Sequence, residues 1–277
     1  MNRDTRTIRD EKKNGSNFSE RLLLFLSRKL GTDDYPGGKE EWDLDGALSL
    51  LCRVLPNFMS GLVGKEILDF GCGLGYQAAA LARNGARYVL GIDMNEKRLE
   101  EARDLARKLG LERQVEFADR LENRCKGRFD MVISQNSMEH YPDPLKTLGE
   151  MRSALNQDGS LLITFGPPWY APYGSHMHFF TKVPWVNIIF DEKTVMKVRA
   201  HFRSDGATRY EEVESGLNKM TVARFEQIVS ESRMKVIYKK YECVKGVQIL
   251  AKLPLIRELF INHVTFELRS DRGLNWA

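Results

Sequence analysis

The stretch 66–76, EILDFGCGLGY, restricts the fold of this chain more than any other. The apolar run 67–70 carries one acid, Asp69, and is followed by three glycines that alternate with other residues. A helix-forming run, QAAALA, follows at 77–82. A strand, a glycine-rich turn and a helix in this order open a nucleotide-binding α/β fold. The glycines let the backbone approach a ligand that a Cβ would block, and the helix directs its free N–H groups at that ligand.

Apolar runs alternate with helical patterns along the next hundred residues. Such alternation predicts a mainly parallel sheet that is covered by helices on both faces. The expected strands are 66–70, 88–93, 115–118, 129–134, 160–165, 234–243 and 263–270, and the expected helices are 75–84, 95–109, 143–155 and 221–232.

Three segments lie outside this alternation. Residues 1–17 are polar and charged, which favours a loose or disordered tail. Residues 18–60 are expected to form a helical cap with helices at 19–30 and 43–55, ahead of a main domain at 61–277. Within that domain, 166–216 is too long and too rich in proline and aromatic residues for an ordinary connection. We expect it to be a substrate lid inserted after the fifth strand.

Composition limits the class of protein. The chain has 277 residues, a net charge of +4 and an ordinary share of apolar and charged residues, which does not by itself favour a nucleic-acid partner. Its four cysteines are scattered without a C-x-x-C pair, so neither a structural zinc site nor an oxidising compartment is expected. The beginning of the sequence lacks the apolar core of a signal peptide, and we expect a cytoplasmic protein.

Four motifs together resemble the class I S-adenosylmethionine-dependent methyltransferases of the small-molecule type. They are ILDFGCGLG at 67–75, VLGID at 89–93, VEFAD at 115–119 and FDMVISQNSMEHYPDP at 129–144. The resemblance implies a Rossmann-like, doubly wound, mainly parallel seven-stranded sheet that ends in an antiparallel hairpin of 234–243 and 263–270. It also implies S-adenosylmethionine as the cofactor and S-adenosylhomocysteine as its product.

The resemblance also assigns the donor site. Asp93, at the end of the second strand, can accept hydrogen bonds from both ribose hydroxyls; the alternative is an acid that caps the next helix. Asp119 would bind the adenine amino group, or it is a solvated loop acid. Asp69 would face the methionine end, and Cys72 is either a ligand contact or a small packed residue. The expected cofactor-binding residues are Asp69, Gly71, Cys72, Gly73, Gly75, Asp93, Met94, Asp119, Arg120 and Gln135.

Two groups of residues are expected on the acceptor side. His140 follows the fourth strand and acts either as a general base on an acceptor hydroxyl or as a structural residue of its loop. Tyr170, Tyr173, His176 and His178 lie in the expected lid and would contact the substrate. The two lid histidines have the spacing of metal ligands but lack an evident third ligand, so no metal is expected.

The predicted function is therefore methyl transfer to a small or lipid-like molecule, with a hydroxyl oxygen as the first choice of acceptor. A lid that is aromatic but not strongly basic does not favour a nucleic-acid substrate. The apolar stretch 247–261 carries Lys252 and Arg257 and either lies on a membrane surface or packs against the lid. Three alternatives stay open: a nicotinamide-dependent oxidoreductase, a non-catalytic S-adenosylmethionine-binding module, and transfer of another group from the same donor.

Overall fold

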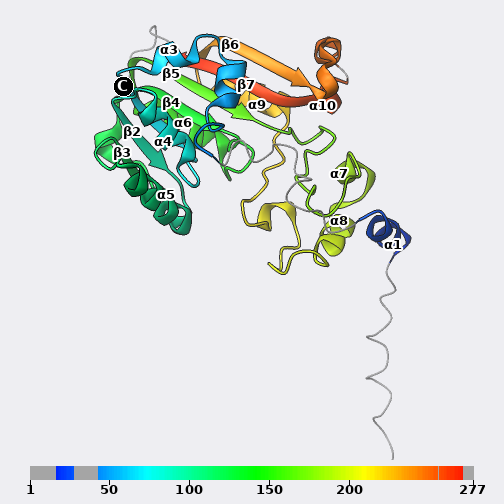
Figure 1. Cartoon of the computed structure of the whole chain (residues 1–277). Coiled ribbons are helices and arrows are strands. Elements are labelled where there is room, and N and C mark those ends of the chain that lie inside the picture. Colours follow the sequence, from blue (N-terminus) through cyan, green and yellow to red (C-terminus); the bar gives the residue numbers. More distant parts are fainter. Residues whose placement is uncertain (1–16, 28–42, 255, 271–277) are drawn as a thin grey trace, which may run out of the picture.

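Seven strands form one mixed sheet in the computed structural model, which describes residues 17–27, 43–254 and 256–270. The strand order is β3-β2-β1-β4-β5-β7-β6 (Figure 1). Their bounds are β1 Glu66–Phe70, β2 Tyr88–Ile92, β3 Val115–Ala118, β4 Phe129–Gln135, β5 Leu155–Phe165, β6 Met234–Cys243 and β7 Ile261–Ser270. The first five strands pair in parallel, and β7 is antiparallel to both β5 and β6. The predicted sheet and its C-terminal hairpin are confirmed.

Strand β1 lies at the point where the strand order reverses. It pairs in parallel with β2 on one side and with β4 on the other, and Asp69 stands opposite Gly91 and Ile133. The chain leaves β1 and β4 toward opposite faces of the sheet, so a crevice forms beyond their carboxyl ends. Folds of this kind bind their ligands in that crevice.

Helices cover both faces of the sheet because successive strand residues face opposite sides. Ile67 belongs to the apolar cluster under α4 (Tyr76–Arg83) and α5 (Glu96–Leu109). Leu68 belongs to the cluster under α6 (Pro144–Ala154) and α9 (Val222–Glu231). The helices begin where capping residues predict, since Asn95 and Asp143 each accept a backbone hydrogen bond three residues later.

The N-terminal helices differ from the predicted cap. The first, α1 (Phe18–Phe25), is followed by residues outside the described ranges, which include the predicted continuation to residue 30. The second, α2 (Ser49–Val54), begins six residues later than predicted, because Asp43 accepts the Gly46 N–H in a turn. A short helix, α3 (Phe58–Leu62), follows it, and α2 and α3 pack in the apolar cluster beneath α4. The predicted tail at 1–17 lies outside the described residues apart from Asn17.

The insertion at 166–216 has an apolar core of its own. It contains α7 (Val186–Ile189), α8 (Glu192–Arg199) and the short helix η4 (Tyr210–Glu212). Leu23 of α1 joins this core, and the Lys197 ammonium of α8 pairs with Glu20 at 2.5 Å. Figure 1 shows α1, α7 and α8 grouped to one side of the sheet. The predicted loop is therefore a small folded unit, which α1 helps to build; its role as a lid stays a prediction.

The segment between β6 and β7 consists of short helices. These are η5 (Val244–Gly246), η6 (Gln248–Lys252) and α10 (Arg257–Phe260). The Phe260 ring meets the Trp185 ring of the insertion edge to face at 6.3 Å, which agrees with the predicted packing against that unit. Of the helices that the structure describes, none has the length and apolarity to cross a membrane.

Replacement of Phe180 by alanine tests whether the insertion has a core. The Phe180 side chain is fully buried in that cluster, so its truncation should lower the free energy of unfolding by about 3–5 kcal/mol. Phe25, which is 85% exposed, provides a matched control that should change little. Urea unfolding measures both variants, and equal losses would contradict the packing described above.

Candidate active site

The glycine loop lies tightly against the segment that follows β4. Gly71 has a φ of +88°, and a Cβ there would lie 2.5 Å from Ser137 Oγ and 2.9 Å from the Tyr141 hydroxyl. The Tyr141 hydroxyl donates to the carbonyl oxygen of Phe70 at 3.0 Å. The end of β1 and the loop that carries His140 are thereby held against each other.

Gly75 has a different function from Gly71 and Gly73. Its φ is +79°, and a Cβ would lie 2.7 Å from Ala102 and 2.8 Å from the Phe117 ring. It therefore allows the start of α4 to pack closely on its neighbours and lines neither cavity described below. Gly73 lines the larger cavity, with no atom within 4 Å of the position of its missing Cβ.

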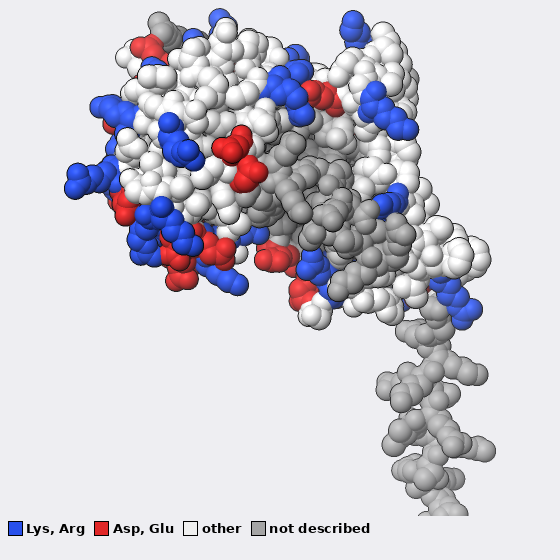
Figure 2. Space-filling model, in the orientation of Figure 1, with Lys and Arg blue, Asp and Glu red and all other residues white. Residues whose placement is uncertain are grey.

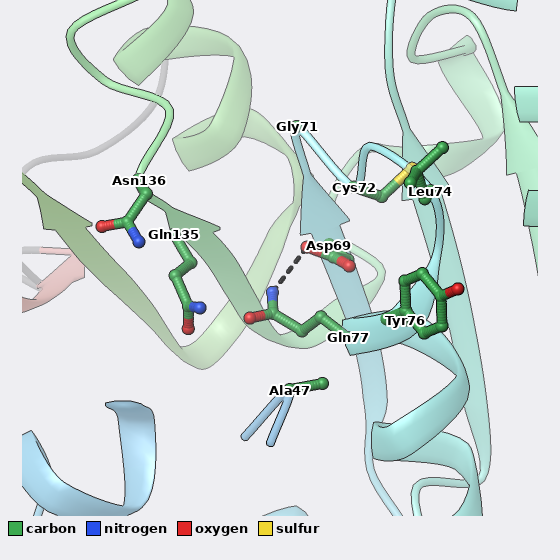
Figure 3. Close-up of a pocket in the computed structure, with 9 residues that line it drawn as sticks. All are labelled: Ala47, Asp69, Gly71, Cys72, Leu74, Tyr76, Gln77, Gln135 and Asn136. Atoms are coloured by element: carbon green, nitrogen blue, oxygen red, sulfur yellow. Dashed lines mark hydrogen bonds between the residues drawn. The ribbon is translucent and has the colours of Figure 1, made fainter. Parts of the chain in front are cut away.

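Two adjoining cavities open at the carboxyl ends of the strands. The larger has a volume of about 1080 Å³ and the smaller about 140 Å³. Gly71, Gln135 and Asn136 line both. The predicted cofactor residues that line the larger cavity are Gly71, Gly73, Asp93, Met94, Asp119, Arg120 and Gln135, while Asp69 and Cys72 line the smaller one (Figure 3).

Asp93 ties the end of β2 to the glycine loop. One carboxylate oxygen accepts the Gly73 N–H at 2.9 Å, and the other accepts the Asn95 N–H at 2.9 Å. Both bonds run to backbone groups, so the side chain faces the cavity in a fixed orientation. Each carboxylate oxygen can accept more than one hydrogen bond, which leaves acceptor capacity for a ligand.

Asp69 is almost fully buried, at 1% exposure. Its Oδ1 accepts a hydrogen bond from Gln77 Nε2 at 2.7 Å, as Figure 3 shows. Its Oδ2 is enclosed and has no hydrogen-bond partner among the described residues. Burial, with a smaller contribution from the Asp93 charge, raises the pKa of Asp69 to about 7, although the Gln77 hydrogen bond acts to lower it. An enclosed oxygen without a partner fits a positively charged or N–H-bearing ligand group.

Four other predicted cofactor residues fall into two groups, exposed and buried. Met94, Asp119 and Arg120 are largely exposed at the cavity, and the Arg120 guanidinium lies 3.9 Å from the Asp119 carboxylate. These side chains are free to contact a ligand at the outer end. Cys72 is buried, and burial raises the pKa of its thiol well above the ordinary value, as expected for a small packed residue.

His140 has a fixed ring orientation. Its Nδ1 lies 2.7 Å from the carbonyl oxygen of Gly216, so this nitrogen carries the proton and donates. Its Nε2 is then the basic nitrogen. Asn218 holds the same loop by donating to the carbonyl oxygens of Met138 and Tyr141. Because Gly216 is the last residue of the insertion and Asn218 follows directly after it, that unit orients the histidine.

Of the four predicted substrate residues, the structure brings only His176 to the larger cavity. Its ring meets the His140 ring edge to face at 5.6 Å, and burial lowers its pKa to about 4. Tyr173 and His178 pack on each other with ring centres 3.7 Å apart, and Tyr170 is 43% exposed; none of these three lines either cavity. The segment that holds these residues consists of turns and bends, so their spacing in the sequence does not predict which side chains face the cavity.

Several residues at the site were not predicted from the sequence. Gln77 has a weak signal, since it begins the helix that follows the glycine loop. Tyr141 and Asn136 lie inside the motif at 129–144 but were given no role. Phe179 and Arg203 line the larger cavity from the insertion, and nothing in the local sequence distinguishes them from surface residues. In the described ranges, no three His, Cys, Asp or Glu side chains gather as a metal site.

Comparison with known proteins agrees with the fold. Residues 62–167 match the family described as a methyltransferase domain. The ubiquinone biosynthesis O-methyltransferase of Actinobacillus pleuropneumoniae is 40% identical over 111 residues, which cover 38% of this chain and 47% of that protein. The chain thus spans about half the length of the curated relatives that it matches.

Solved structures share the fold. An S-adenosylmethionine-dependent methyltransferase from Mesorhizobium loti has a TM-score of 0.53 at 21% identity, covering 84% of this chain and 98% of that one. The magnesium protoporphyrin IX methyltransferase of Synechocystis, solved with bound S-adenosylhomocysteine, has a TM-score of 0.52 at 18% identity, covering 93% and 95%. Residues 62–167 thus match a methyltransferase domain, and the sheet has the fold of these S-adenosylmethionine-dependent methyltransferases.

The Asp69→Asn variant tests the buried carboxyl group. Burial raises its pKa from 3.8 to about 7. Between pH 3.8 and about pH 7, the folded protein therefore retains a proton on Asp69 that the unfolded chain has released. Ionisation of Asp69 therefore costs stability as the pH rises through this window. Asparagine can keep the Gln77 hydrogen bond without that cost, so the variant should be more stable at about pH 8 by up to about 4 kcal/mol.

Urea unfolding at several pH values measures this difference, which should shrink toward zero below about pH 3, where the wild-type carboxyl is protonated in both states. Asp45→Asn, at an exposed position, is the control. A constant difference between Asp69→Asn and the wild type across the whole range would contradict the assignment.

Proposed function

We propose that this protein transfers a methyl group from S-adenosylmethionine to a hydroxyl oxygen of a small or lipid-like molecule. One observation carries the proposal. The glycine loop, Asp69 and Asp93 border two adjoining cavities at the switch point of the sheet, and His140, whose tautomer is fixed, borders the larger one. The loop and the two carboxylates are suited to hold the donor, and the histidine is suited to take a proton from the acceptor.

The residues on the donor side fit S-adenosylmethionine. The enclosed Asp69 Oδ2 lacks a partner, which suits the ammonium group of the methionine end. Gly73 leaves open space where a Cβ would approach the ligand, and Asp93 faces the larger cavity with acceptor capacity for ribose hydroxyls. Asp119 and Arg120 stand at the outer end, where an adenine ring would lie. When bound, S-adenosylmethionine supplies a methyl group on a positively charged sulfur.

The acceptor side supports proton removal. His140 Nε2 is available as a base because Nδ1 is fixed on the Gly216 carbonyl. It would receive the hydroxyl proton while the acceptor oxygen gains the methyl group and the leaving sulfide keeps the electron pair of the broken carbon–sulfur bond. The chain contributes mainly by aligning the two reactants and excluding water, and a positioned base adds roughly 10²–10⁴-fold.

The size of the larger cavity suits two reactants together. Sites for a single ligand measure roughly 300–1,000 Å³, and this cavity has about 1080 Å³. Its wall on the insertion carries apolar side chains, among them Met177, Phe179, Val213 and Leu217. The curated relatives that match are named for O-methylation in ubiquinone biosynthesis, which supports a hydroxyl acceptor with apolar parts.

Contact with a membrane surface through 247–261 stays a prediction. Val247, Ile249 and Leu253 are each at least 43% exposed in this segment. On the face that Figure 2 shows, Lys and Arg are interspersed with Asp and Glu. This mixture does not favour a nucleic-acid substrate. A cytoplasmic location likewise stays a prediction.

Replacement of His140 by glutamine tests the base. We expect the rate of methyl transfer to fall roughly 10²–10⁴-fold, because the proton acceptor is lost, while the affinity for S-adenosylmethionine stays unchanged. Transfer from labelled S-adenosylmethionine to a panel of hydroxylated aromatic and lipid-like compounds provides the measurement. His201→Gln, at an exposed position away from the cavity, is the control. Full turnover in His140→Gln would show that His140 is structural only.

Replacement of Asp93 by alanine tests the donor site. The variant loses the carboxylate that orients the glycine loop and faces the cavity, so its affinity for S-adenosylmethionine should fall about tenfold or more. Isothermal titration measures the affinity, with Asp104→Ala on the exposed side of α5 as the control. Unchanged affinity in Asp93→Ala would rule out the donor assignment of this residue.

A further inference from the structure

The wall that the insertion contributes to the larger cavity carries two guanidinium groups beside one aromatic ring. Arg199 lies at the end of α8, and Arg203 follows four residues later. The Phe179 ring centre is 5.8 Å from the Arg199 guanidinium carbon and 4.9 Å from that of Arg203. All three residues line the cavity.

Arg199 has its charge neutralised within the protein. Only 4% of it is exposed, and its two terminal nitrogens donate to the two oxygens of Asp205 at 2.6 and 2.5 Å. This fork holds the carboxylate ionised, since the Arg199 hydrogen bonds lower the pKa of Asp205 to about 2. Arg199 and Asp205 therefore form a rigid, neutral pair in the cavity wall.

Arg203 has no such partner. No carboxylate of the described residues comes within ion-pair distance of its guanidinium, and its one close contact of note is the face of Phe179. Besides Asp205, five acids line the cavity, and none of them forms an ion pair with Arg203 within 4 Å: Asp93, Glu96, Asp119, Glu150 and Glu214. The Phe179 ring covers one face of the Arg203 guanidinium, which leaves its N–H edges for a ligand.

We propose that Arg203, supported by Phe179, binds an oxyanion of the methyl acceptor, a carboxylate or a phosphate. A planar guanidinium donates two parallel hydrogen bonds to either group. This inference rests on the proposed function, and it specifies the acceptor further as a molecule that bears both a hydroxyl and a negative charge.

The chain connects the two ends of this acceptor site directly. His176, whose ring touches that of His140, is three residues from Phe179. Three residues of extended chain span at most about 11 Å. His140 and Arg203 line the same cavity, so a single acceptor bound there can present its hydroxyl to His140 and its anion to Arg203.

Calorimetric titration of the full chain, saturated with S-adenosylhomocysteine, tests the proposal. The probes are 4-hydroxybenzoate, 4-hydroxyphenyl phosphate and the uncharged 4-hydroxybenzamide. The wild type should bind at least one anionic probe about tenfold or more tightly than the amide, and the tighter anion identifies the oxyanion. Arg203→Gln should lose this preference. Because Arg203 is exposed, the replacement should leave folding intact, and Arg209→Gln in the same unit, which lies outside the cavity, should keep the preference.

Equal affinity of the wild type for the three probes, including no measurable heat from any of them, would overturn the proposal. So would a preference for the anions that persists in Arg203→Gln. The proposed function fails separately, since it requires that S-adenosylhomocysteine itself binds. Its binding to the wild type and to Arg203→Gln is measured first in the same experiment and should be equal.

Discussion

The close approach of the glycine loop to the segment after β4 determines the arrangement of the site. At Gly71 the backbone lies where a Cβ would touch Ser137 and Tyr141, and the Tyr141 hydroxyl binds the Phe70 carbonyl oxygen. This contact joins the carboxyl ends of β1 and β4, which leave the sheet toward different faces. The donor loop and the loop of His140 consequently border one space, although nearly seventy residues of sequence separate them.

The insertion forms one wall of the larger cavity and also fixes the orientation of His140. The Gly216 carbonyl oxygen, at its end, accepts from the His140 ring, and Asn218, which follows it, holds the His140 loop. Its core includes Leu23 of α1, so a helix from the beginning of the chain stabilises a unit that orients a residue in the middle. A change in the packing of the insertion is therefore expected to affect proton transfer to His140 more than the affinity for the donor.

The strands and most of the residues that line the cavities near the glycine loop could be predicted from the sequence because their signals are local. Apolar runs predicted β3 and β6 with the bounds that the structure has, and the motif spacing placed Asp93 and Asp119 at the strand ends that line the cavity. Strand β5 begins five residues earlier than predicted, since the polar residues 156–159 lie in an irregular register beside β4. An alternation of apolar residues does not indicate such an irregularity.

The acceptor side could be predicted only in part, because it depends on contacts between distant segments. The sequence indicated an aromatic insertion, but Tyr173 and His178 stack on each other and only His176 reaches the larger cavity. Arg203 and Phe179 become a feature of the site through the fold of the insertion and not through any motif. The same holds for α1, whose place beside α8 follows from Leu23 entering a core built by residues 177–217.

The central claim is that the glycine loop at the switch point holds S-adenosylmethionine and not a dinucleotide. Isothermal titration of the full chain with S-adenosylhomocysteine and, separately, with NAD tests this most directly. We expect saturable binding of S-adenosylhomocysteine at a single site and no measurable binding of NAD. Binding of NAD without binding of S-adenosylhomocysteine would contradict it.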